Sequence, residues 1–171
     1  MEIRHMEQND DKYAISRIYE ESWKSAYAGI IPQSYLESIS GDNWIDKLDN
    51  AERNTLIMIE DGKMIGTSSY GRSRFADYED YGEIISIYFL PQYMGKGYGK
   101  KLLEAVMREL FILGYADIFL WVLEENQRAR RFYEKAGFVF SGNYLDTNIG
   151  GKELREMQYC YHSNIIVNAG E

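Results

Sequence analysis

One stretch decides the fold of this chain: Ile84-Ile85-Ser86-Ile87-Tyr88-Phe89-Leu90-Pro91-Gln92-Tyr93-Met94-Gly95-Lys96-Gly97-Tyr98-Gly99-Lys100-Lys101-Leu102-Leu103. In it, an apolar strand runs through a glycine-rich turn directly into an amphipathic helix. Its three glycines at alternate positions let the backbone turn and approach a ligand closely, because glycine has no Cβ. Unpaired N–H groups at the start of the helix can then point at one anion, and the helix dipole adds about half a positive charge. With Lys96, Lys100 and Lys101 beside it, the turn is predicted to bind phosphate.

The glycine spacing excludes two common phosphate-binding motifs. A Rossmann fingerprint needs Gly-x-Gly-x-x-Gly, whereas the third glycine here falls one position early. A P-loop needs Gly-Lys followed by Ser or Thr, and neither Gly-Lys pair of this turn is followed by either residue. The pattern that remains is Gln92-x-x-Gly95-x-Gly97.

This pattern, placed between a strand and a helix, resembles the pyrophosphate-binding motif of the GNAT superfamily of acetyl-CoA-dependent N-acetyltransferases, which reads Gln/Arg-x-x-Gly-x-Gly/Ala. A second stretch is similar to a later motif of that family, Asn-x-x-Ala-x-x-Phe-Tyr followed by Gly-Phe. It reads Asn126-Gln127-Arg128-Ala129-Arg130-Arg131-Phe132-Tyr133-Glu134-Lys135-Ala136-Gly137-Phe138. Each motif follows an apolar strand. The resemblance is sharp from about residue 82 to residue 140 and loose elsewhere.

The rest of the chain alternates strands and helices, with no low-complexity tract, repeat or linker. Periodicity and turn residues predict helices over 10–28, 32–39, 42–50, 97–113 and 126–136, and strands over 3–6, 55–60, 63–71, 83–90, 118–123, 138–145 and 154–161. The polar segment 72–81 is predicted to be a loop. This order indicates a single α+β domain over residues 1–171.

The resemblance implies a GNAT-like mixed, mostly antiparallel sheet of about seven strands flanked by helices. In that family two central parallel strands, here 83–90 and 118–123, splay apart at one end. The pantetheine arm of acetyl-CoA lies in the gap as if it were a further strand. Residues 82–140 would then form the acetyl-CoA-binding core, and the helices within residues 1–54 would lie on the acceptor side.

The resemblance also implies which residues bind acetyl-CoA, the expected co-substrate. They are Ile87, Phe89, Leu90, Met94, Gly95, Lys96, Gly97, Tyr98, Gly99, Lys100 and Asn126. The first three would offer main-chain groups to the pantetheine amides, and residues 94–100 would hold the pyrophosphate. Asn126 would cap its helix and also bond the pantetheine, although capping alone explains it as well. Arg128, Arg130 and Arg131 would attract the nucleotide phosphates or else form a solvated helix face.

Acetyl transfer to an amine requires a neutral nucleophile, stabilisation of the carbonyl oxygen and a proton for the departing thiolate. Tyr133 matches the family tyrosine beside the cofactor sulfur, and a phenol with a pKa of about 10 can deliver that proton. The alternative is that Tyr133 only packs beside Phe132. Glu83 heads the central strand, at the distance before Phe89 where some family members place a catalytic base, and desolvation would raise its pKa. An exposed strand-end charge, or a water chain in place of a base, are the alternatives.

Composition narrows the class of protein. A chain of 171 residues with 45% hydrophobic residues can bury one large core. No run approaches the ~20 apolar residues of a membrane span, and the N-terminal residues lack the apolar core of a signal peptide. Since a lone Cys160 also excludes an internal disulfide, a cytoplasmic location is expected. Cys160 and two histidines supply too few ligands for a metal site, and none is predicted.

The charge is acidic, with 27 Asp and Glu against 19 Lys and Arg and a net charge of −8. This argues against a nucleic-acid partner, which requires a basic face. It suits a cationic partner, or serves solubility alone.

The expected acceptor is a primary amine on a small molecule or a peptide. The residues expected around it are Trp23, Tyr27, Tyr35 and Trp44 as walls, with Glu20, Glu21 and residues 77–80 nearby. Polyamines, aminoglycosides, amino acids and protein N-termini all stay open, as does a homodimer. A rival interpretation is a CoA-binding sensor or structural subunit without turnover, and the presence of Tyr133 favours the enzyme.

Overall fold

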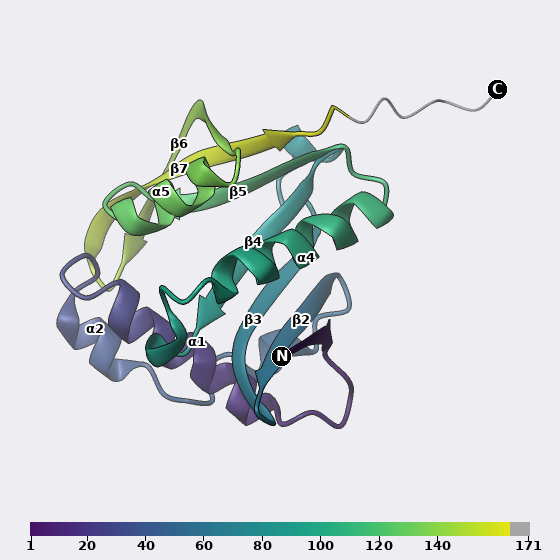
Figure 1. The fold of residues 1–171 in the computed structure, drawn as a ribbon. Coiled ribbons are helices and arrows are strands. Elements are labelled where there is room, and N and C mark those ends of the chain that lie inside the picture. The colour runs from purple at the N-terminus through teal and green to yellow at the C-terminus, as the bar shows by residue number, and fades with distance from the viewer. Residues whose placement is uncertain (165–171) are drawn as a thin grey trace.

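The computed structural model describes residues 1–164, which form a seven-stranded sheet with helices on two sides (Figure 1). The strands are β1 (Glu2–His5), β2 (Arg53–Glu60), β3 (Lys63–Arg72), β4 (Gly82–Phe89), β5 (Asp117–Leu123), β6 (Val139–Ile149) and β7 (Lys152–His162). The helices are α1 (Lys12–Ala26), α2 (Gln33–Ser38), α3 (Ile45–Leu48), α4 (Tyr98–Ile112) and α5 (Gln127–Lys135), with short 3-10 turns η1 (Ala76–Tyr78) and η2 (Pro91–Tyr93). The predicted α+β sheet of about seven strands is confirmed.

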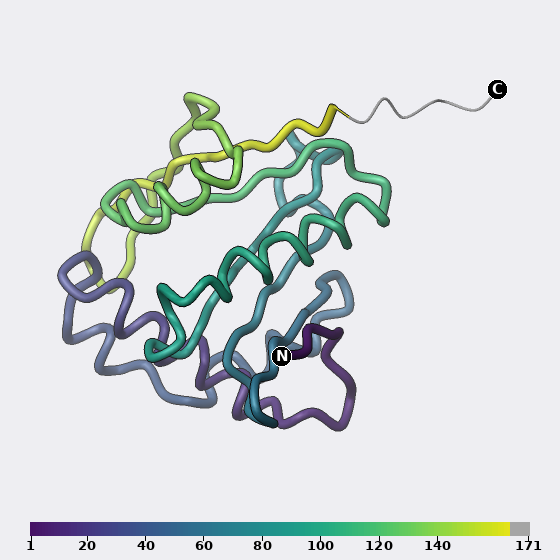
Figure 2. Tube along the Cα trace, in the orientation of Figure 1, coloured from purple at the N-terminus to yellow at the C-terminus, as the bar shows by residue number. Residues whose placement is uncertain are grey.

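The sheet is mixed, as expected. Its strand order is β1-β2-β3-β4-β5-β7-β6, and β4 and β5 are the parallel neighbours among otherwise antiparallel pairs. The chain path in Figure 2 places β1, near the N-terminus, and the β6–β7 hairpin at opposite ends of the sheet. Within the described residues, no helix is both long enough and apolar enough to cross a membrane.

Two segments differ from the sequence prediction. The last two strands are longer than expected, because Gly150 and Gly151 both adopt positive φ, at 61° and 87°, and close a tight hairpin between them. The helix predicted over 42–50 shortens to α3, and Trp44 stands at its N-cap.

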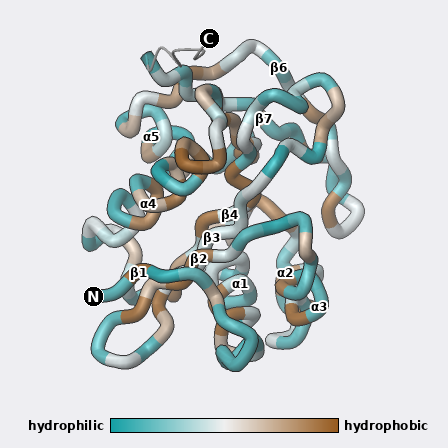
Figure 3. Tube along the Cα trace, turned by 90° about the vertical axis from the view of Figure 1, so that its right-hand side faces the viewer, coloured by the Kyte–Doolittle hydropathy of each residue, from teal (hydrophilic) through white to brown (hydrophobic). Residues whose placement is uncertain are grey.

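The sheet carries a hydrophobic core on each face. The core on one side joins α4 to the central strands and is built around Leu102, Leu103, Val106, Leu110, Ile118 and Leu120. The core on the other side joins α1, α2 and α3 to the sheet and is built around Ile15, Tyr19, Leu36, Trp44, Ile57 and Leu123. Figure 3 shows apolar segments along the central strands, while the connecting loops are mostly polar. The parallel strands β4 and β5 are apolar at most positions for this reason.

The parallel pair β4 and β5 is joined only at its beginning. Gly82 pairs with Ile118 and Glu83 with Phe119, and no later residues of the two strands are paired. A β-bulge at Ile85 contributes to the bend of β4, because Ile84 pairs with Tyr70 and Ser86 with Ser69, which leaves Ile85 as the extra residue. The expected splay of the central strands is therefore present, and it opens the sheet in its middle.

On the other edge of β4, the chain approaches β3 closely at one position. Gly66 on β3 pairs with Phe89, and a Cβ added to Gly66 would lie 2.3 Å from Cε1 of the Phe89 ring. We predict that Gly66→Ala lowers the free energy of unfolding by about 1–3 kcal/mol, measured by urea denaturation, because the ring must shift to a strained position. The loss should be smaller in a Phe89→Leu background, where the side chain is shorter. Equal losses in both backgrounds would contradict the steric explanation.

Candidate functional site

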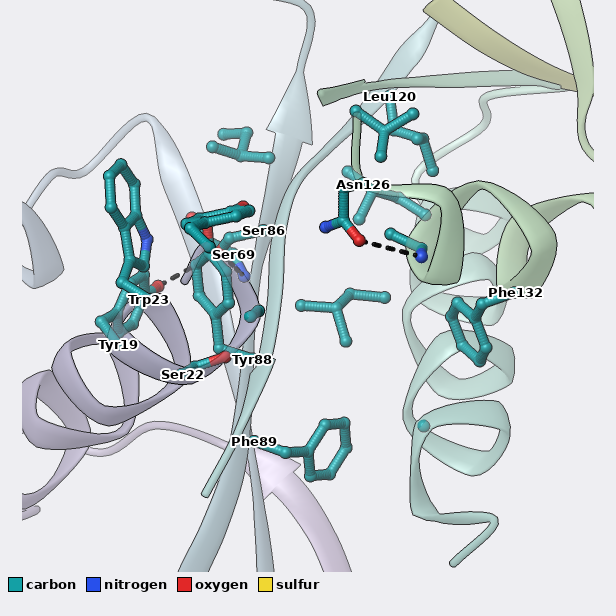
Figure 4. A pocket seen from close by; sticks show the side chains of 18 of the residues that line it. Tyr19, Ser22, Trp23, Ser69, Ser86, Tyr88, Phe89, Leu120, Asn126 and Phe132 are labelled. Atoms are coloured by element: carbon teal, nitrogen blue, oxygen red, sulfur yellow. Dashed lines mark hydrogen bonds between the residues drawn. The ribbon is translucent and has the colours of Figure 1, made fainter. Parts of the chain in front are cut away.

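A cleft of about 870 Å³ lies where β4 and β5 diverge. Its walls come from β4 between Ile84 and Phe89, from β5 between Leu120 and Leu123, and from α1, α5 and the start of α4. In Figure 4, Tyr19, Trp23 and Tyr88 lie on one side of the gap, and Asn126 and Phe132 lie on the other. The splayed strands therefore create one continuous cavity through the middle of the sheet.

The glycine-rich turn forms one end of this cleft. Gly95 and Gly97 adopt positive φ values of 75° and 85°, and Gly97 is the N-cap of α4. A Cβ added to Gly97 would meet no heavy atom within 4 Å, so the backbone there faces open space. The first N–H groups of α4 have no partner within the helix and carry its positive end. This geometry fits an anionic ligand such as pyrophosphate.

Two cations of the lining lie at this end of the cleft. Lys100 comes from the first turn of α4, and Arg128 comes from α5. Nη1 of Arg128 lies 4.0 Å from Sδ of Met94, which places the guanidinium against the turn. Arg130 instead donates to the Glu124 carbonyl and to the Tyr159 hydroxyl, at 3.0 and 3.2 Å. Of the three arginines named from the sequence, Arg128 is the one positioned to meet phosphates.

The open edges of β4 and β5 form the middle of the cleft. Main-chain groups that face the gap beyond Glu83 have no partner strand, so they can bond an extended ligand that carries amides. Ile87 and Phe89 line the cleft, and their contact with the cofactor stays a prediction. Leu90 lies outside the lining, and its N–H already donates to the Ile65 carbonyl at 2.9 Å.

The remaining residues predicted to bind cofactor divide in the same way. Met94, Gly99, Lys100 and Asn126 line the cleft, whereas the side chains of Lys96 and Tyr98 do not. Lys96 lies over the Tyr93 ring, and the Tyr98 hydroxyl donates to Glu60 at 3.2 Å. Asn126 caps α5, because its Oδ1 accepts from the Ala129 N–H at 3.2 Å, and its contact with the cofactor stays a prediction.

Tyr133 lines the cleft from α5. Its ring packs between Phe132 and Phe138, with ring centroids 5.1 and 5.8 Å away. Burial, and secondarily the nearby Tyr88, raise the pKa of the Tyr133 phenol above its ordinary value. The hydroxyl therefore keeps its proton at physiological pH, in a position between the two ends of the cleft.

Glu83 is placed differently from what its predicted role requires. It is fully buried and lies outside the cleft lining. Its Oε1 accepts from Nη2 of Arg74 at 2.6 Å, and its Oε2 accepts from the Arg74 backbone N–H at 3.0 Å. Both carboxylate oxygens are thus engaged where β4 and β5 part. The role of Glu83 as a base stays a prediction, and these contacts favour a positioning role.

Glu156 is a carboxylate in the cleft that the sequence analysis missed. It lies on β7 opposite Leu123, is half-buried, and faces the cavity. Burial raises its pKa, Arg74 opposes the increase, and Glu83 adds to it. The strand pattern held a signal, because Glu156 stands between Leu154 and Gln158, which are buried at alternate positions of β7. A charged residue among the inward-facing positions of a strand indicates that its side chain either faces a cavity or is paired with an opposite charge.

The end of the cleft opposite the glycine-rich turn is aromatic. Trp23, Tyr27 and Trp44 line it as expected, with Trp23 ring centroids 5.0 Å from Tyr27 and 5.6 Å from Trp44. Tyr35 does not line it. The acidic neighbours expected from the sequence, Glu20, Glu21 and residues 77–80, are also absent from the lining. Along α1, Glu20 pairs with Lys24 and Glu21 with Arg17.

Comparison with known proteins agrees with this geometry. The family model described as "Acetyltransferase (GNAT) family" matches residues 14–138. An uncharacterized N-acetyltransferase, YuaI of Bacillus subtilis, is 31% identical over 120 residues, which cover 68% of this chain and 69% of YuaI. A spermidine N(1)-acetyltransferase of Thermoplasma acidophilum is 27% identical over 134 residues, which cover 75% and 83% of the two chains. The crystal structure of the PaiA N-acetyltransferase of Thermoplasma acidophilum in complex with coenzyme A superposes with a TM-score of 0.71 at 25% identity, covering 94% of this chain and 100% of that one.

The anion site at the glycine-rich turn can be tested with matched glycines. We predict that Gly97→Asp removes most of the affinity for CoA, measured by calorimetry, because a carboxylate and a Cβ would occupy the anion site. Gly114→Asp is the control, since Gly114 also has positive φ, at 97°, has no heavy atom within 4 Å of an added Cβ, and lies outside the cleft. Equal CoA affinity in the two variants would reject this assignment.

Proposed function

The chain belongs to the GNAT acetyltransferase family, and we propose that it transfers an acetyl group from acetyl-CoA directly to a primary amine held in the same cleft. The observation that carries the proposal is the continuity of the cavity. It runs from the cationic glycine-rich turn, past Tyr133, to the aromatic end formed by α1 and α3. Both substrates can therefore be present together, and no residue needs to carry the acetyl group between them.

The turn and the open strand edge bind and orient the co-substrate. Gly95 and Gly97 bring N–H groups to the pyrophosphate, and Lys100 and Arg128 neutralise its charge. Main-chain groups of Ile87 and Phe89 hold the pantetheine amides. Acetyl-CoA, when bound, supplies an activated acetyl group and a sulfur leaving group.

Tyr133 is the proposed proton donor. Its raised pKa keeps the phenol protonated, so a proton is always available at the hydroxyl oxygen. As the new C–N bond forms and the C–S bond breaks, Tyr133 donates its proton to the departing sulfur, and solvent later returns one to the phenol. Its ring, fixed between Phe132 and Phe138, holds the hydroxyl in place.

Glu156 is the proposed proton acceptor. A primary amine with a pKa near 10.4 is neutral in only about one molecule in two thousand at pH 7, so a base is needed. Glu156 faces the cavity. Glu83, the base predicted from the sequence, instead forms an ion pair with Arg74. We assign Glu83 to holding Arg74. Burial raises the pKa of Glu156, Arg74 lowers it and Glu83 raises it. Burial raises the pKa of the Tyr27 and Tyr88 phenols, and the charge of Glu156 adds to that increase.

Acetyl-CoA consumption across a panel of amines tests the proposal. The enzyme should release CoA with at least one primary amine. A CoA-binding sensor or structural subunit would instead bind CoA by calorimetry and release none with any member of the panel.

The proton donor is tested by removing one oxygen atom. We predict that Tyr133→Phe lowers kcat about a hundredfold or more and leaves CoA affinity little changed, because the packing ring remains. Tyr161→Phe is the matched control, since Tyr161 packs against the same Phe138, at 5.5 Å between centroids, but lies outside the cleft. Wild-type turnover by Tyr133→Phe would show that Tyr133 only packs.

The roles of Glu156 and Glu83 can be distinguished by how the activity of their variants depends on pH. In the wild type, activity should fall as pH drops through the raised pKa of Glu156, because the protonated carboxyl cannot accept a proton. Glu156→Gln should therefore be slowest relative to wild type near neutral pH and should recover towards pH 9, where more amine is already neutral.

Glu83→Gln is expected to lose a constant factor across the same pH range, with a lower melting temperature from the broken buried pair. The assignment is wrong if the deficit of Glu83→Gln shrinks with rising pH and that of Glu156→Gln does not.

A further inference from the structure

The charged residues that line the cleft are mostly cations, whereas the chain as a whole is acidic. The chain carries a net charge of −8, yet the lining contains five cations and one carboxylate, Glu156. Lys100 and Arg128 lie beside the glycine-rich turn, and Arg74 is paired with Glu83. Two cations, Arg53 and Lys47, remain at the aromatic end. An acidic chain that collects cations in its cavity indicates a ligand with negative charge there.

Arg53 is half-buried at the first position of β2, and its guanidinium makes no ion pair or hydrogen bond with any residue between 1 and 164. Its charge acts on the Tyr19 phenol: burial raises the pKa of Tyr19 to about 12, and Arg53 opposes the increase. Arg53 also lines the cavity. A partly buried arginine without a partner is prepared for an external anion.

A row of hydroxyl groups lies beside Arg53. Thr55 pairs with Ser69 and Ser69 pairs with Ser86, so these three side chains stand next to one another across β2, β3 and β4. All three line the cleft, and Thr55 stands two residues after Arg53, which puts both side chains on the same face of β2. The Tyr19 hydroxyl completes the row from α1, 3.2 Å from Oγ of Ser86 (Figure 4).

The hydroxyls of this row retain hydrogen-bonding capacity. Within the described chain, the hydroxyls of Thr55 and Ser69 have no hydrogen-bond partner, although the two residues are only 8% and 6% exposed. A hydroxyl can donate to an oxyanion, and an arginine can donate two parallel hydrogen bonds to a carboxylate. These residues come from four elements and line the same cavity. The contact between Tyr19 and Ser86 uses one of their two hydroxyl protons, which leaves the other, with those of Thr55 and Ser69, for a ligand.

We propose that Arg53, together with Thr55, Ser69, Ser86 and Tyr19, forms a subsite for a carboxylate of the acceptor. The acceptor is then an amine that also carries a carboxylate, such as an amino acid or a short peptide with a free C-terminus. Its amine lies towards Glu156, and its apolar part lies against Trp23 and Trp44. A polyamine, the acceptor named for one relative, would bring positive charge next to Arg53 and is disfavoured. This proposal rests on the proposed function, because it assigns the acceptor of the same cleft.

The test compares acceptors that differ in the carboxylate alone. Leucine and glycyl-leucine are each assayed beside their C-terminal carboxamides, with spermidine as the polycation. In the wild type, we expect acetylation of at least one carboxylate acceptor with a KM at least tenfold below that of spermidine. Arg53→Gln should raise the KM of that acceptor about tenfold or more, the range of one charged hydrogen bond, with kcat little changed. The KM of the matching carboxamide should stay within twofold, since it has no charge to lose.

Arg72→Gln is the matched control, because Arg72 lies near Arg53 on the neighbouring strand β3 but pairs with Glu52 outside the cleft. It should change neither KM. CoA affinity, measured by calorimetry, should be the same in all three proteins and shows that each is folded. An equal KM increase for carboxylate and carboxamide in Arg53→Gln, or efficient acetylation of spermidine alone, would overturn the subsite.

The subsite can be tested even if the proposed function is wrong. If no amine is acetylated, calorimetry of N-acetyl-leucine with the CoA-loaded protein still tests the subsite. Binding that disappears in Arg53→Gln and persists in Arg72→Gln supports it, and wild-type binding of the acetylated carboxamide with equal affinity refutes it.

Discussion

The site depends on the early end of pairing between β4 and β5. Two residue pairs join these strands, and every later main-chain group that faces the gap lacks a strand partner. Buried N–H and C=O groups left without partners are costly, so such an edge persists where a ligand or water can bond it. The same divergence makes room for the 870 Å³ cleft. One break in the hydrogen-bond ladder therefore supplies both the cavity and the groups that can hold an extended amide ligand.

The Arg74–Glu83 pair lies at the point where the two strands part. Glu83 is in the last paired position, opposite Phe119, and its carboxylate is held by both the side chain and the backbone of Arg74. A fully buried carboxylate needs such compensation, because losing hydration is expensive. The pair thereby fixes the loop after β3 against the head of β4. It also brings the guanidinium into the cleft lining close enough to act on Glu156, which connects the fold of this junction to the electrostatics of the site.

The two ends of the cleft differ in how they are built. The end at the glycine-rich turn is built mainly from consecutive residues, the turn and the helix that follows it, so most of its geometry is a local property of the sequence, while Arg128 is added from α5. The aromatic end is assembled from α1, α3, β2, β3, β4 and β7, and neighbouring side chains there are far apart along the chain. Tyr19 and Ser86, for example, are 67 residues apart and lie 3.2 Å from each other.

This difference explains what could be predicted. The sequence alone determined the strands and helices, the glycine-rich turn and the family, because period, capping residues and local motifs act over a few positions. It did not determine that Arg74 would form an ion pair with Glu83, or that Glu156 would face the cavity. Those outcomes follow from strand register and from which side chains meet across the sheet. They are contacts between residues far apart along the chain, so only the tertiary structure determines them.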